Sequence, residues 1–201
     1  MKEKAFSHPT LLISGIAGGS ASLLPLRSAL RRRGIDARIW PTPLVLAHAV
    51  GHYSSRLRSD LKAAGSAIGE RLNLVGWSMG GYIAVDAMED PAAAASTRRV
   101  ITFGTPHDGL EVAKIPRWLG LRVNVSDFAP GSEMLGRHRR LINDPGRYWE
   151  FFAVNGECDT LAPGPLSSIP PASALTGPFS HVSLIADPRL FDLIARLVLQ
   201  P

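Results

Sequence analysis

The sequence predicts an α/β fold in which one parallel β-sheet carries helices on both of its faces. Short apolar runs alternate along the chain with longer stretches of helical spacing, and glycine or proline separates most of them. Strands that alternate with helices in this way pair in parallel through right-handed crossovers. The runs are continuously apolar, which is typical of strands that are buried on both faces.

The first half of the chain supplies three strands and two helices. Thr10–Ser14, an apolar run that glycines follow, predicts the first strand. Ser22–Arg33 has leucines at helical spacing and precedes a glycine, so we expect a helix there. A second strand, a second helix and a third strand follow at Ala37–Trp40, Ser54–Arg71 and Leu72–Trp77.

The chain after residue 77 contributes two further helices and two further strands. We expect a helix rich in small residues at Gly80–Glu89 and an amphipathic helix at Asp187–Leu199. Between them, Val100–Phe103 and Tyr148–Val154 predict strands. The stretch over 107–147 is the longest without a clear core strand, so we expect a small lid or insertion there.

Length and composition favour one globular domain that spans residues 1–201. The chain has 201 residues, of which 45% are hydrophobic and 19% charged, and this balance excludes an intrinsically disordered chain. No apolar run approaches the ~20 residues that a membrane-spanning helix needs. Glycines interrupt the apolar stretch that begins at Leu11 before it reaches the length of a signal peptide, so we expect a cytoplasmic protein.

The cysteine content and the charge exclude further classes. The single cysteine, Cys158, cannot form an internal disulfide, and no cluster of histidine and cysteine has the spacing of zinc ligands. The net charge of +5 comes from scattered arginines with two small clusters, at 31–33 and 137–140. The first cluster ends a predicted helix, where cations complement the helix dipole. Neither cluster is interleaved with aromatic residues as base stacking requires, so we expect no nucleic-acid partner.

The pentapeptide Gly76–Gly80, with the sequence GWSMG, joins the third predicted strand directly to a helix. A Gly-x-Ser-x-Gly pattern alone is weak, but a strand–turn–helix setting is what a nucleophile elbow needs. The turn lifts the Ser78 hydroxyl out of the sheet and places it at a helix N-terminus, where backbone N–H groups can receive negative charge. We therefore expect Ser78 to be a nucleophile; the alternative is a glycine-rich tight turn in an ordinary α/β domain.

Four segments of the chain resemble the α/β-hydrolase family, in particular its compact bacterial lipases and esterases. They are Leu12–Gly18, Gly76–Gly81, Phe103–Gly109 and Asn155–Leu184, in the order that the family has. The resemblance implies a reduced α/β-hydrolase fold of about six mostly parallel strands, because residues 1–9 leave no room for the two antiparallel strands that open the full-size fold. It also implies cleavage of carboxylic esters through an acyl-enzyme, with no metal or organic cofactor.

The resemblance also assigns the acid and the base, which follow the nucleophile in this family. His181 stands just before the last helix, where the family keeps its base, although it could instead be a hydrogen-bonded structural histidine. Asp159 follows a predicted strand and matches the acid loop, with Asp127 as the alternative acid. His107 resembles a packing residue near the site, and His138, among arginines, is expected at the surface.

An oxyanion hole needs two backbone donors aimed at the reacting carbonyl oxygen. The family places one directly after the nucleophile and the other after the first strand, which implies the N–H groups of Met79 and Ile16. Ser14 stands where the family usually has a histidine that braces this loop. The glycine-rich run 15–20 lacks the lysine of a P-loop and the spacing of a dinucleotide fingerprint, so we expect no phosphate cradle.

The substrate is the part of the function that the sequence defines least. We expect Trp77, Trp118 and Leu119 to bind a small-molecule ester or lipid, in transient contact with a lipid interface, although the apolar residues near Trp118 could equally pad the core. An acyltransferase or thioesterase with the same Ser-Asp-His triad remains an alternative. A non-catalytic binding protein that retains the fold is a further one.

Overall fold

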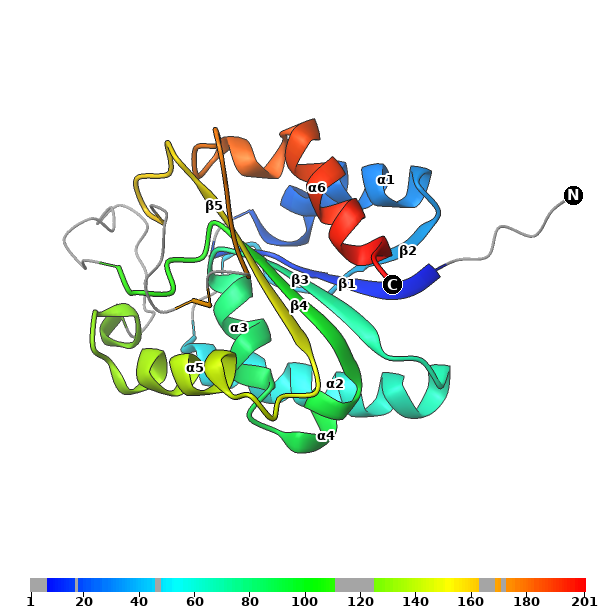
Figure 1. The fold of residues 1–201 in the computed structure, drawn as a ribbon, viewed down its shortest axis with the longest axis horizontal. Helices are drawn as coiled ribbons and strands as arrows, with labels where there is room; N and C mark the ends of the chain where they lie inside the picture. Colours follow the sequence, from blue (N-terminus) through cyan, green and yellow to red (C-terminus); the bar gives the residue numbers. More distant parts are fainter. Residues whose placement is uncertain (1–6, 17, 46–47, 111–124, 163–168, 171–172) are drawn as a thin grey trace, which may run out of the picture.

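The computed structural model describes residues 7–16, 18–45, 48–110, 125–162, 169–170 and 173–201. Its centre is one six-stranded sheet, with helices on both faces (Figure 1). The strands are β1 (Ser7–Ile13), β2 (Ile35–Ile39), β3 (Leu72–Trp77), β4 (Thr97–Phe103), β5 (Glu150–Gly156) and β6 (Ala174–Gly177). Their order is β2-β1-β3-β4-β5-β6 and every neighbouring pair is parallel, which confirms the predicted fold class.

The helices form one layer on each side of the sheet (Figure 1). On one face lie α1 (Leu24–Arg32) and α6 (Pro188–Leu199), and on the other α2 (Val50–Ile68), α3 (Met79–Ala87), α4 (Pro91–Ala95) and α5 (Glu133–Asn143). Short 3₁₀ turns η1 (Gly19–Leu23), η4 (Val125–Phe128) and η6 (Ser183–Ile185) lie in the connections. In the part of the chain that the structure describes, no helix combines the length and the apolar character that crossing a membrane requires.

The largest difference from the sequence-based expectation lies in the segment 107–147. Its last third contains α5, which is capped by Ser132, whose hydroxyl accepts a hydrogen bond from the N–H of Leu135. Met134, Leu135 and Ile142 of α5 are buried in the core cluster that lies on the α3 side of the sheet. This part of the segment is therefore one of the helices that cover the sheet. Residues 111–124, including Trp118 and Leu119, lie outside the described residues.

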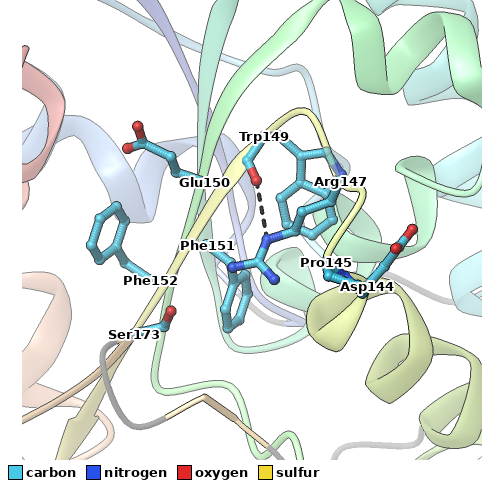
Figure 2. Close-up of a pocket in the computed structure, with 8 residues that line it drawn as sticks. All are labelled: Asp144, Pro145, Arg147, Trp149, Glu150, Phe151, Phe152 and Ser173. Carbon is cyan, nitrogen blue, oxygen red and sulfur yellow. Dashed lines mark hydrogen bonds between the residues drawn. The ribbon is translucent and has the colours of Figure 1, made fainter.

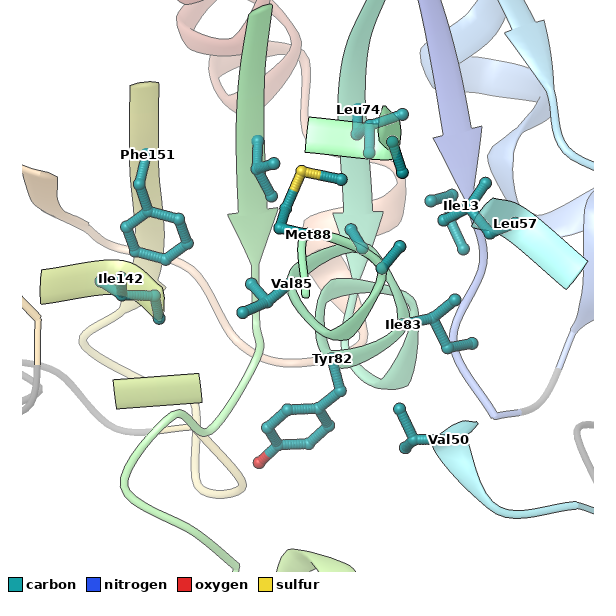
Figure 3. Close-up of a cluster of buried hydrophobic side chains, with 14 of the residues drawn as sticks. Ile13, Val50, Leu57, Leu74, Tyr82, Ile83, Val85, Met88, Ile142 and Phe151 are labelled. Carbon is teal, nitrogen blue, oxygen red and sulfur yellow. The ribbon is translucent and has the colours of Figure 1, made fainter. Parts of the chain in front are cut away.

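The central strand β3 contributes to the core on both faces of the sheet. All six of its residues are buried, and Leu74 packs on the α3 side whereas Val75 packs against α1 and α6. The next element, α3, is buried along all nine of its residues. Figure 3 shows its side chains, among them Tyr82 and Val85, among residues of the surrounding strands and helices. Because α3 is buried on every side, its neighbours pack against it all round and fix the position of its N-terminus.

One carboxylate interrupts the apolar surface of α3. Asp86 is 1% exposed and accepts a hydrogen bond from Arg137 of α5 over 2.7 Å, while Nε2 of His138 lies 3.3 Å from it. Ser54 and Arg58 of α2 donate to the same carboxylate. Burial on its own would raise the pKa of Asp86, but the hydrogen bonds from these partners hold that pKa well below its ordinary value. The charged carboxylate therefore joins α3 to both neighbouring helices.

The expectation that His138 lies at the surface is wrong. Its side chain is fully buried, although the next two residues of α5, Arg139 and Arg140, are exposed. Arg139 and Arg140 misled the interpretation because they lie on the outer face of the helix, whereas Arg137 reaches the same buried carboxylate as His138. The partner that justifies burial of His138 is Asp86, which lies 52 residues earlier in the chain.

His107 is a second buried histidine, as its resemblance to a packing position implies. It follows β4, its Nε2 lies 2.8 Å from the Thr102 hydroxyl, and its ring contacts those of Tyr82 and Phe151 edge-on. Its Nδ1 is buried and has no hydrogen-bond partner among the described residues. Burial lowers the pKa of His107 to about 3, so the imidazole is neutral in the folded protein at ordinary pH.

Replacing Asp86 with Asn should lower the free energy of unfolding by about 3 kcal/mol, because it leaves buried cationic and polar groups without their carboxylate. Glu89→Gln is the matched control, since Glu89 is 47% exposed and pairs with the same two arginines. We expect it to cost less than about 1 kcal/mol. Urea denaturation at neutral pH measures both values, and equal losses would contradict a special role for the buried carboxylate.

His107 should make the folded state sensitive to acid. An unfolded chain protonates a histidine near pH 6.5, whereas folded His107 resists protonation until about pH 3. Its stabilising contribution is therefore complete above pH 6.5 and is lost progressively as the pH falls below that value. Between pH 7 and pH 5 the free energy of unfolding should fall by about 2 kcal/mol less in His107→Gln than in the wild type. Urea titrations at the two pH values test this, and an identical fall in both proteins would refute it.

Candidate active site

The loops that carry or adjoin predicted site residues follow the ends of four neighbouring strands. Gly15 comes after β1, Ser78 after β3, Gly104 after β4 and Asp159 after β5. Because all strands of the sheet are parallel, their carboxyl ends lie along one edge. The topology therefore gathers these loops on one side of the molecule, and ligands of such sheets bind at that edge.

The turn between β3 and α3 has the backbone conformation of a nucleophile elbow. Among the described residues, Ser78 is the one non-glycine residue with a positive φ, at φ 52° and ψ −119°. Its N–H donates to the carbonyl of Phe103 over 2.9 Å, and its carbonyl accepts the Thr105 hydroxyl over 2.9 Å. A Cβ on Gly76 would lie 2.5 Å from the carbonyl oxygen of Gly80, so the turn needs glycine there.

The N-terminus of α3 faces the same loop cluster. Met79 is its first residue, and the N–H groups of a first helical turn have no partner within the helix. Ser78 stands at the N-cap position, but its side chain makes no capping hydrogen bond. The partial positive charge of the helix end is therefore available next to the Ser78 hydroxyl, where it favours an anion.

His181 and Asp159 form a hydrogen-bonded pair. Nδ1 of His181 lies 3.0 Å from Oδ2 and 3.2 Å from Oδ1 of Asp159. Asp159 is buried, and its Oδ1 also accepts the N–H groups of Leu161 and Ala162 over 2.9 and 2.8 Å. A carboxylate can only accept, so Nδ1 carries the hydrogen and Nε2 of the neutral ring keeps its lone pair. The partner of His181 is thus Asp159, whereas Asp127, the alternative acid, lies in η4.

The environment keeps Asp159 ionised. Burial on its own would raise the pKa of this carboxyl. The hydrogen bonds from His181 and from the backbone N–H groups outweigh burial, and they hold the pKa of Asp159 below its ordinary value. A buried carboxylate that is charged and fixed by backbone donors can orient an imidazole and stabilise its protonated form.

Glycine 104 connects this pair to the elbow. It has a φ of +57°, and a Cβ there would lie 3.3 Å from Oδ2 of Asp159 and 3.4 Å from Nδ1 of His181. The preceding residue, Phe103, is the one whose carbonyl accepts the N–H of Ser78. On the other side, the His181 ring lies 5.8 Å from the ring of Trp77, measured between centroids. The imidazole therefore packs beside both chain segments that hold Ser78.

The loop after β1 lies against the elbow as well. A Cβ on Gly15 would be 3.0 Å from Cε3 of Trp77 and 3.1 Å from Cβ of Ser78, so a side chain there would crowd the elbow. Ile16, the first predicted oxyanion donor, is the next residue along the chain, and Met79, the second, directly follows Ser78. Both predicted donors thus belong to segments that contact Ser78 or adjoin it.

Of the three residues predicted to bind substrate, the structure describes one, Trp77. Trp77 is only 8% exposed, and its ring packs between His181 and Gly15. Trp118 and Leu119 are not among the described residues. Sequence reasoning did not single out the exposed Val182, which directly follows His181, because one apolar residue outside a periodic pattern gives no signal.

A hollow of about 490 Å³ lies at a different place (Figure 2). It is lined by residues between Asp144 and Phe152 together with Ser173, and within it Arg147 donates to the carbonyl of Trp149 over 3.1 Å. These residues surround the start of β5, whereas Asp159 follows its end. The hollow is therefore separate from the candidate site. Among the described residues, no group of three or more His, Cys, Asp or Glu side chains is placed to hold a metal ion.

The fold of this chain is similar to the folds of known proteins, although its sequence matches no family model and no curated protein. The mature form of Bacillus licheniformis lipase BlEst2 superposes with a TM-score of 0.79 and 20% identity, over 96% of this chain and 93% of that chain. The metagenomic α/β hydrolase MGS-MChE2 from lagoon sediments gives 0.62 and 17%, over 95% and 90%.

Aspergillus fumigatus lipase B is similar over part of its length. Its TM-score is 0.72 at 14% identity, and the match covers 96% of this chain but 53% of that chain. This chain thus spans about half the length of the Aspergillus lipase. Identities at this level carry the likeness of the fold alone. With its six parallel strands and its two helix layers, the chain has the α/β-hydrolase fold.

Proposed function

We propose that the protein is a serine hydrolase that cleaves carboxylic esters through an acyl-enzyme intermediate. The observation that carries this proposal is the His181–Asp159 pair, which packs against Gly104 beside the elbow that holds Ser78. A strained serine at a helix N-terminus, a base and a buried carboxylate are the parts that acyl transfer by serine requires. The likeness of the fold to lipases supports the same class of reaction.

In the first half of the proposed cycle, Nε2 of His181 takes the proton of the Ser78 hydroxyl as its oxygen attacks the ester carbonyl. A bond forms from Ser78 Oγ to the carbonyl carbon, and the π electrons move onto the carbonyl oxygen. Asp159 stabilises the imidazolium that results. The N–H groups of Ile16 and Met79 stabilise the oxyanion, which carries more negative charge than the carbonyl of the bound ester.

In the second half, the imidazolium gives its proton to the leaving alcohol as the carbon–oxygen bond breaks. A water molecule then loses a proton to His181 and attacks the acyl-enzyme, and the same oxyanion site serves again. The imidazolium returns the proton to Ser78 as the carboxylic acid leaves. In this cycle His181 transfers each proton and the backbone N–H groups stabilise the oxyanion. The proposal therefore assigns no cofactor.

The proposed substrate is a lipid or another small-molecule ester that the enzyme meets in transient contact with a lipid interface. Support comes from two exposed apolar side chains on loops that adjoin the site. Val182 is 73% exposed and directly follows His181, and Leu44 is 73% exposed beside the loop that follows β1. Exposed apolar side chains gain free energy when an acyl chain or a lipid surface covers them.

Ser78→Ala should abolish both turnover and covalent labelling. We expect the rate of p-nitrophenyl butyrate hydrolysis to fall at least ~10³-fold, as for loss of a triad member, and labelling by a fluorophosphonate probe to disappear. Ser59→Ala, an exposed serine on α2, is the matched control and should retain both. Undiminished hydrolysis in Ser78→Ala would sink the proposal. A series of p-nitrophenyl esters from acetate to palmitate, with a thioester alongside, then defines the acyl group and the leaving group.

A further inference from the structure

The loop between β1 and α1 is hydrogen-bonded to Thr42, which lies in the loop after β2. The Thr42 hydroxyl lies 2.6 Å from the Ser14 hydroxyl, at the start of the first loop. The N–H of Thr42 donates to Ser20 Oγ over 3.1 Å, and that hydroxyl donates back to the Thr42 carbonyl over 3.4 Å. Thr42 therefore contacts the loop both where it leaves the strand and where it enters η1.

The surroundings of the Ser14–Thr42 hydrogen bond make it costly to break. Ser14 is fully buried, and a buried hydroxyl that loses its partner pays the full cost of desolvation. Thr42 directly precedes Pro43, which disfavours the helical conformation for its backbone and favours an extended one. A Cβ on Gly19 would lie 2.9 Å from the carbonyl oxygen of Pro43, so the two loops also meet through their backbones.

The opposite side of the same loop touches the elbow. Gly15 packs against Trp77 and Ser78, at distances that leave little room for a side chain there. The loop is thus held between Thr42 on one side and the proposed nucleophile on the other. Ile16 lies two residues after Ser14, so the position of its N–H relative to Ser78 depends on how Ser14 is held.

We propose that Thr42 is a positioning residue for the oxyanion hole. Its hydroxyl holds Ser14, and through Ser14 it keeps the N–H of Ile16 at the distance from Ser78 that a tetrahedral intermediate requires. This inference rests on the proposed function, because it assigns a role within the same reaction. The arrangement matters because donors act on an oxyanion only within about 2.7–3.1 Å, and a shift of about 1 Å costs on the order of 10²-fold in rate.

Thr42→Val removes the hydroxyl while keeping the shape of the side chain, and Thr42→Ser keeps the hydroxyl. We expect Thr42→Val to lower kcat for p-nitrophenyl butyrate about 10- to 100-fold and to leave KM within about 2-fold, because the donor acts mainly on the transition state. The same variant should weaken inhibition by a trifluoromethyl ketone, which forms a tetrahedral adduct, by a similar factor. Thr42→Ser should match the wild type.

Two further variants separate positioning from general damage. Ser14→Ala should reproduce Thr42→Val, and the double variant should lose no more than either single variant, because both delete the same hydrogen bond. Thr97→Val is the matched control, since it also removes a hydrogen-bonded threonine hydroxyl, here a buried one that donates to the carbonyl of Ala93 at the opposite end of the sheet. It should leave kcat unchanged even where it lowers the unfolding midpoint.

Hydrogen exchange of the loop gives a readout that does not depend on turnover. The amides of residues 14–20 should exchange faster in Thr42→Val than in Thr42→Ser. Unchanged exchange, wild-type kcat in Thr42→Val, or an equal loss in Thr42→Ser would overturn the inference while the proposed function stands. Hydrolysis that survives in Ser78→Ala would instead refute the proposed function, and with it the role of this loop in an oxyanion hole.

Discussion

The geometry of the site depends on the positive φ of Ser78. A non-glycine residue in such a conformation costs about 1–3 kcal/mol and persists only where its surroundings over-determine it. Hydrogen bonds to Phe103 and from Thr105 hold the two sides of its peptide unit, and the backbones of β1 and α3 approach too closely for any side chain at Gly80. The burial of α3 on all sides, together with the ion pairs of Asp86 near its other end, prevents the helix from moving to relieve the strain.

The parallel topology of the sheet then brings Asp159 and His181 near Ser78, although both lie far from it in the sequence. Asp159 follows β5, two strands from the elbow, and His181 arrives from the connection between β6 and α6. What brings them within reach is the absence of a side chain at Gly104, where the imidazole and carboxylate lie against the backbone. Glycine plays the same part at Gly15. Close approach of backbones at these two positions lets loops from separate strands share one small volume.

The sequence was sufficient for the central strands and the elbow because their signals are local. Each of these strands is a continuous apolar run, and GWSMG carries its meaning in its own setting. The proposed acid and base, Asp159 and His181, were assigned from the order in the chain that the family resemblance implies. The sixth strand, Ala174–Gly177, is short and half-exposed, so no apolar run marked it. His138 could not be interpreted correctly from local patterns, and Thr42 gave no signal, because their partners Asp86 and Ser14 lie 52 and 28 residues away. The helix α5 did carry a local signal, a capping serine before an apolar stripe, within a segment that we expected to be an insertion.

A crystal structure of the protein after reaction with a fluorophosphonate tests the central claim most directly, because the adduct mimics the tetrahedral intermediate. We predict a phosphorus bonded to Ser78 Oγ, with its phosphoryl oxygen within hydrogen-bond distance of the N–H groups of Ile16 and Met79. Nε2 of His181 should face the adduct while its Nδ1 remains on Asp159. An adduct on a different residue, or an imidazole whose Nε2 points away from the phosphorus, would contradict this account.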